Sequence, residues 1–159
     1  MKVNSREISL VAVYAALYAV LVIAFAPISF GMIQFRVAGI LRPGIARMRI
    51  LALGYAIGVV VGNILSPYAG IYELLFMPVA SFIAGLLGYE VTRRFGGGYW
   101  SCGVVVAVII PLCVGWMLEQ LFMLPLAVTL PGLFISEFLV NMLGAGIFTA
   151  LDKRMKWWI

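Results

Sequence analysis

The run ISLVAVYAALYAVLVIAFAPI, residues 8–28, contains no charged side chain and is long enough to cross a lipid bilayer as one helix. Apolar runs of similar length recur along the chain, whereas a transmembrane barrel would need alternating strands of about ten residues. The chain of 159 residues is 65% hydrophobic and 11% charged. Soluble proteins average about 25% charged residues. The sequence therefore predicts an all-α integral membrane protein with a single transmembrane domain, residues 1–159.

The segment of residues 33–49 decides the number of spans, because it holds four of the basic residues. If residues 33–46 cross as a short helix shielded by its neighbours, the basic clusters at 42–49, 93–94 and 153–156 all lie on the side of the N-terminus, and Arg36 lies outside or in a cavity. Positive residues concentrate on the cytoplasmic side, so we expect both ends to be cytoplasmic. The predicted transmembrane helices are 8–28, 33–46, 50–66, 70–92, 99–124 and 130–151.

Several functions are disfavoured by what the sequence lacks. There is no histidine, and the two cysteines, Cys102 and Cys113, lie in an apolar run where we expect them to be packing residues. No glycine-rich loop ending in Lys-Ser or Lys-Thr is present, so the chain has no P-loop for ATP. We expect no enzyme activity, no catalytic residues, no metal and no cofactor in this chain. Topology explains the basic residues, so we expect no nucleic-acid binding.

Ionisable groups at bilayer depth indicate function, because an unpaired charge there costs several kcal/mol. Glu119 and Glu137 are the leading candidates, and Asn141 lies one turn beyond Glu137 on the same helix face. The alternative is that these carboxylates pair with arginines or lie near the headgroups. We expect that structural role for Glu73 and Glu90, which are close to predicted helix ends.

Further polar and aromatic residues complete a candidate small-molecule site with apolar walls and a few convergent polar groups. Gln34 and Arg36 follow the first predicted helix at its external side, and Asn63 lies near the external end of the third. Trp116 offers a ring on which a planar ligand can stack, or it packs against lipid or the core.

Small residues line one side of the first predicted helix at four-residue spacing. Such spacing lets a second helix approach closely. The partner is a helix of the same chain or of another subunit. The residues are Ala12, Ala15, Ala16 and Ala19.

Two stretches near the N-terminus, AALYAVL at 15–21 and APISFGMIQFRV at 26–37, resemble the opening of the QueT family. Weaker similarity follows at 62–66, 136–137 and 143–144. QueT proteins are substrate-binding S-components of energy-coupling factor (ECF) transporters. The resemblance implies a six-helix bundle in a prokaryotic plasma membrane, with both ends cytoplasmic.

The resemblance also implies partners and a substrate. The partners are a transmembrane coupling protein (EcfT), against which the alanine face of the first helix docks, and two cytoplasmic ATPases that use ATP. The implied substrate is a queuosine precursor, a 7-deazaguanine such as queuine or preQ1.

A guanine-like edge presents two adjacent N–H donors that one carboxylate accepts together. We expect Glu137 to fill that role, with Glu119 second, and Gln34 or Asn63 to meet the ring carbonyl. Three alternatives remain: an S-component for another vitamin, an oligomeric channel or proton-coupled carrier that titrates Glu119 and Glu137, and a membrane enzyme acting on lipid.

Overall fold

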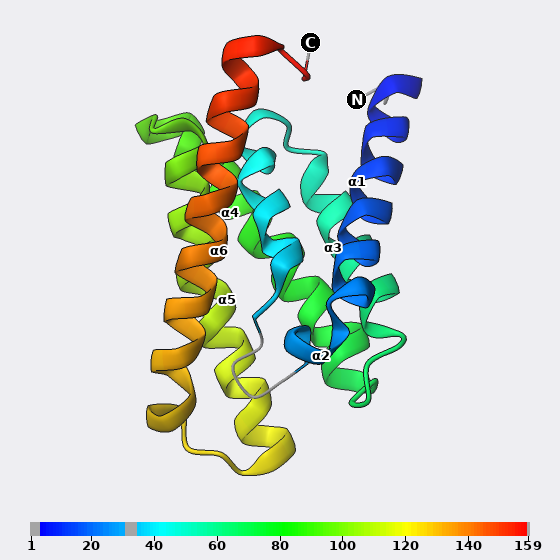
Figure 1. The fold of residues 1–159 in the computed structure, drawn as a ribbon, viewed down its shortest axis with the longest axis vertical. Coiled ribbons are helices and arrows are strands. Elements are labelled where there is room, and N and C mark those ends of the chain that lie inside the picture. Colours follow the sequence, from blue (N-terminus) through cyan, green and yellow to red (C-terminus); the bar gives the residue numbers. More distant parts are fainter. Residues whose placement is uncertain (1–3, 31–34, 159) are drawn as a thin grey trace.

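The protein is a helical bundle in the computed structural model, which describes residues 4–30 and 35–158 (Figure 1). No strand occurs within these two ranges. The helices in chain order are α1 (Ser5–Ala24), α2 (Ala26–Ser29), the 3₁₀ helix η1 (Val37–Arg47), α3 (Leu51–Asn63), the π-helix η2 (Tyr72–Phe76), α4 (Met77–Phe95), α5 (Gly98–Phe122) and α6 (Leu126–Arg154).

Four helices of the described residues are long and apolar enough to cross a membrane. They are α1, the continuous helix formed by η2 and α4 (Tyr72–Phe95), α5 and α6. The other two predicted spans are shorter: α3 has 13 residues and η1 has 11. Because a 3₁₀ helix rises about 2.0 Å per residue, η1 still extends roughly 22 Å through the bundle.

The predicted second helix differs from the observed one in type and position. Residues 33 and 34 lie outside the described residues, and the helix present is the 3₁₀ helix Val37–Arg47. Pro43 inside it lacks an N–H donor, and two glycines lower its α-helical propensity. The last predicted helix, 130–151, also differs, because α6 begins at Leu126 and includes Pro131.

The 3₁₀ helix η1 occupies the centre of the bundle (Figure 1). It packs against α1, α4, α5 and α6, and each residue from Val37 to Ala46 is at least partly buried. The outer helices show the opposite pattern, with large apolar side chains such as Leu17, Ile83 and Leu143 exposed on their outward faces. Large apolar side chains thus face outward as well as into the core, as expected of helices that contact lipid.

Both described ends of the chain lie at the same end of the bundle (Figure 1). Arg6 Nη2 donates a hydrogen bond to the Trp157 carbonyl at 3.4 Å, and Arg47 Nη2 lies 2.8 Å from Asp152 Oδ2. We call this the basic end. The expectation that Arg42 belongs to it is wrong, because Arg42 is buried in the bundle against Glu137.

Gly144 is a point of close backbone approach between α6 and η1. A Cβ at this position would overlap the carbonyl oxygen of Ile40, which is backbone and cannot move aside as a flexible side chain can. Gly146, on the same helix, has its nearest such neighbour 4.0 Å away, in the Trp100 ring. Glycine at 144 is therefore a requirement of packing.

We expect Gly144→Ala to destabilise the detergent-solubilised protein by about 2–3 kcal/mol, because overpacking forces backbone shifts. Gly146→Ala is the matched control and should leave the midpoint of thermal unfolding unchanged or slightly raised. Equal midpoints for the two variants would contradict the observed contact between η1 and α6.

Candidate functional site

A buried ion pair between Arg42 of η1 and Glu137 of α6 lies inside the bundle. The Arg42 side chain is 1% exposed and that of Glu137 is 5% exposed. Arg42 Nη2 donates to the Tyr18 hydroxyl at 3.2 Å, and Asn141 Nδ2 donates to Glu137 Oε2 at 3.1 Å. We call these four residues the inner network. It connects α1, η1 and α6.

Most of the polar groups in the inner network bond to one another. Glu137 Oε2 receives hydrogen bonds from both Arg42 and Asn141. The guanidinium of Arg42 also lies over the Tyr55 ring, 5.3 Å from its centroid. The charges of Arg42 and Glu137 therefore neutralise each other, and the hydrogen bonds and the cation–π contact stabilise them further.

A second buried group lies nearer the opposite end of the bundle. Arg36 precedes η1, Asn63 ends α3 and Glu73 belongs to η2. Arg36 Nη2 lies 3.9 Å from Glu73 Oε1, and Asn63 Nδ2 donates to the backbone carbonyl of Glu73 at 3.0 Å. We call these three residues the outer cluster. Arg36 and Arg42 are six positions apart, which corresponds to about 12 Å along a 3₁₀ helix.

The outer cluster retains more unused hydrogen-bonding capacity than the inner network, in which Arg42 Nε and Asn141 Oδ1 lack a hydrogen-bond partner among the described residues. Both carboxylate oxygens of Glu73, Nε and Nη2 of Arg36, and Oδ1 of Asn63 are buried without a hydrogen-bond partner among the described residues. The ion pair at 3.9 Å is longer than a hydrogen bond. Each unmet buried group costs about 1–3 kcal/mol, so the cluster is suited to a polar ligand.

The π-helix η2 determines how Glu73 is presented. Short π segments within helices occur frequently at functional sites. Here Asn63 hydrogen-bonds the Glu73 backbone carbonyl, while the Glu73 side chain stays completely buried. Arg36 also makes a cation–π contact with Phe30, whose ring centroid is 5.6 Å from the guanidinium carbon. A donor-rich and an acceptor-rich side chain thus face each other in a fixed arrangement.

The structure divides the sequence-predicted site residues between these two groups. Arg36 and Asn63 are in the outer cluster, and Glu137 and Asn141 are in the inner network. Glu119 is half-buried near the end of α5 and forms no side-chain hydrogen bond or ion pair within 4–30 and 35–158. Gln34 lies outside the described residues.

Trp116 is 41% exposed and lies among aromatic side chains. Its ring centroid is 5.8 Å from that of Tyr72 and 4.8 Å from that of Phe76. Tyr72 directly precedes Glu73, so Trp116 supports the helix segment that carries the outer cluster.

The alanine face of α1 is also divided. Ala15 and Ala19 are buried, with 7% and 4% exposure, and pack within the bundle. A Cβ at Gly58 of α3 would lie 3.0 Å from the Ala15 carbonyl, which shows how closely α1 and α3 pack. Ala12 and Ala16 are exposed. The surface of α1 accessible to another subunit therefore includes Ala12 and Ala16, without Ala15 and Ala19.

Sequence reasoning did not select Glu73 or Arg42 for the site. One signal is present: Arg36 and Arg42 both lie in the predicted second span, and an arginine buried there needs a carboxylate, although the positive-inside argument placed Arg42 at the cytoplasmic end. Glu137 serves one, and Glu73 serves the other. The π-helical conformation of η2 has no comparable signature in the sequence.

Comparison with known families identifies the chain. The sequence profile of the QueT transporter family matches residues 8–153. The chain belongs to the QueT transporter family. The resemblance inferred from residues 15–37 is thereby confirmed. No curated protein and no solved structure matches the chain. As a QueT protein it is a component of a membrane transport system.

In this QueT protein, we expect Glu137→Leu to lower the free energy of unfolding by about 3–5 kcal/mol, because it leaves the Arg42 guanidinium buried without a counter-charge. Replacing both partners, as in Arg42→Met with Glu137→Leu, should restore most of that loss. Thermal unfolding in detergent, followed by circular dichroism, measures both effects.

The pair Arg47–Asp152 at the basic end is the more exposed control, with side chains 41% and 13% exposed. Asp152→Asn keeps an acceptor for the Tyr99 hydroxyl, so it should cost about 1 kcal/mol or less. A double variant as unstable as Glu137→Leu would show that the inner network contributes more than neutralisation of Arg42.

Proposed function

We propose that this chain is the high-affinity substrate-binding subunit of an ECF-type importer, and that its substrate is a queuosine precursor such as queuine or preQ1. Membership of the QueT family supports the transport role. The observation that carries the binding role is the outer cluster, in which Arg36, Glu73 and Asn63 are buried with unused donors and acceptors. The inner network is the structural support of that site.

The chemistry of the outer cluster suits a 7-deazaguanine edge. The two oxygens of one carboxylate accept two adjacent N–H donors of such a ring, and we assign this role to Glu73. Nε and Nη2 of Arg36 then donate to the neighbouring ring carbonyl, and Asn63 Oδ1 accepts a further N–H. Glu137 was the first choice on sequence grounds, but its Oε2 already accepts from Arg42 and Asn141.

We further propose that the chain crosses the membrane six times with the basic end in the cytoplasm. Four helices have the length and apolarity to span. The polar backbone of η1 is shielded by its neighbours, which is the condition under which irregular backbone is tolerated at membrane depth. The positive-inside rule places the basic end, with Arg6, Arg93, Arg94, Lys153 and Lys156, in the cytoplasm.

For energy, this protein depends on partners in our proposal: a transmembrane coupling protein and two cytoplasmic ATPases. The chain has no P-loop of its own. The exposed residues Ala12 and Ala16 on α1 lie four apart, so they form a shallow surface on which a helix of the coupling protein can pack closely.

Glu73→Gln should weaken binding of the 7-deazaguanine about a hundredfold, because two charge-assisted hydrogen bonds are lost or weakened. Isothermal titration calorimetry of the purified protein with queuine, preQ1, guanine and a vitamin panel measures this. Glu90→Gln, on the same continuous helix but away from η2, is the control and should bind as the parent protein does.

Two results would contradict the assignment. If Glu137→Gln abolishes binding in a protein that still unfolds cooperatively, while Glu73→Gln leaves the Kd unchanged, the ligand is bound at the inner network. If the parent protein binds another vitamin and no deazapurine, the transport role stands and the proposed substrate is wrong.

The double variant A12L/A16L should co-purify with the coupling protein at least about tenfold less than the parent chain, since bulky side chains prevent close helix contact. Substrate binding by the isolated chain should be unchanged. Ala127→Leu, an exposed alanine of α6, is the control for added bulk. If the parent chain, the double variant and Ala127→Leu all co-purify equally with the coupling protein, the partner surface lies elsewhere.

A further inference from the structure

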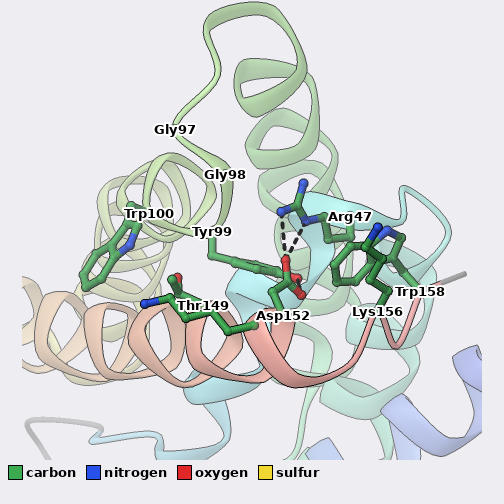
Figure 2. Close-up of a pocket in the computed structure, with 10 residues that line it drawn as sticks. Arg47, Gly97, Gly98, Tyr99, Trp100, Thr149, Asp152, Lys156 and Trp158 are labelled. Atoms are coloured by element: carbon green, nitrogen blue, oxygen red, sulfur yellow. Dashed lines mark hydrogen bonds and ion pairs between the residues drawn. The ribbon is translucent and has the colours of Figure 1, made fainter.

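A hollow of about 430 Å³ lies at the basic end of the bundle. Its walls come from the turn between α4 and α5, the last residue of η1, and the C-terminal part of α6 with the residues that follow (Figure 2). Figure 2 shows Trp100 and Trp158 at opposite ends of the row of lining side chains, with Tyr99 and Asp152 between them. None of these groups takes part in the inner network or the outer cluster.

The hollow is positively charged. Three basic side chains, Arg47, Lys153 and Lys156, line it with one acidic side chain, Asp152, which leaves a net charge of +2. Asp152 is already engaged, since it pairs with Arg47 and accepts a hydrogen bond from the Tyr99 hydroxyl. Lys153 and Lys156 are exposed and pair with no carboxylate of the described residues. Two ammonium groups are thus available to an anion.

An apolar groove of about 350 Å³ lies further along the same two helices. It is lined by Ala107 and Val108 of α5 and by Phe134, Ile135, Phe138 and Leu139 of α6. Ala107 is seven residues from Trp100, and Phe138 is eleven from Thr149. At 3.6 residues per turn, residues with either spacing lie on nearly the same face of their helix. The groove therefore continues the line of the charged hollow, about 10 Å deeper along α5.

Trp100 connects the two features. Its side chain is 47% exposed, and the terminal atom of its ring lies 4.0 Å from a Cβ position at Gly146 of α6. Tryptophan is enriched at the level of the lipid headgroups, so Trp100 marks the boundary between the charged hollow and the apolar groove.

We propose that the hollow binds the phosphate of an anionic phospholipid and that the groove holds one of its acyl chains. Lys153 and Lys156 supply the charge, since basic pockets between transmembrane helices are suited to anionic headgroups. The first backbone N–H groups of α5, at Gly98 and Tyr99, add positive partial charge. A free phosphate would use the hollow without the groove, so the amphipathic pairing of the two favours a lipid.

The test uses native mass spectrometry of the detergent-purified chain titrated with phosphatidylglycerol or phosphatidylcholine of identical acyl chains. We expect phosphatidylglycerol to bind at least about tenfold more tightly. The variant K153Q/K156Q should lose about tenfold in phosphatidylglycerol affinity, with its thermal unfolding unchanged because both lysines are exposed.

The control R93Q/R94Q removes the same charge from the end of α4, at two exposed arginines that do not line the hollow. It should change phosphatidylglycerol affinity less than twofold. An equal loss in both variants would show diffuse attraction to the basic end and overturn the site. If glycerol 3-phosphate displaces the lipid at concentrations near the lipid's own Kd, the hollow is a site for free phosphate esters. That result would overturn the proposal that a lipid binds there.

Discussion

The pair between Arg42 and Glu137 is the interaction on which the rest of this structure depends. A charge at the depth of the bundle is tolerated when a partner neutralises it and further hydrogen bonds satisfy its remaining groups. Tyr18 provides one such bond to Arg42, and Asn141 provides one to Glu137. Because the four residues come from α1, η1 and α6, the requirement to neutralise one guanidinium also fixes how three elements lie against one another.

The position of η1 follows from that requirement. An 11-residue 3₁₀ helix containing a proline has little stability of its own. It is held by the ion pair at its middle, by the contact of Gly144 with the Ile40 backbone and by the pair of Arg47 with Asp152 at its end. The outer cluster begins where η1 begins, so these same contacts also hold Arg36 opposite Glu73.

The two buried charge groups differ in how completely their polar atoms are used. In the inner network the carboxylate accepts two hydrogen bonds, whereas in the outer cluster both carboxylate oxygens lack a hydrogen-bond partner within the described part of the chain. Unmet buried groups raise the free energy of the protein. In the proposed function, a ligand that meets these groups gains that free energy on binding, which gives affinity and selectivity for polar ligands.

The helical membrane fold and the family could be read from the chain, because apolar runs such as residues 8–28 and the motif at 26–37 are local properties. The sequence also shows arginines in a span that must be shielded, although the positive-inside argument placed Arg42 at the cytoplasmic end and not inside the bundle. The sequence does not show which carboxylate meets which arginine. Glu73 and Glu137 lie in different helices, and their distances to η1 depend on packing. The 3₁₀ form of η1, the π-helix that presents Glu73 and the burial of Ala15 and Ala19 likewise follow from contacts between segments far apart in sequence, and such contacts have no local signature.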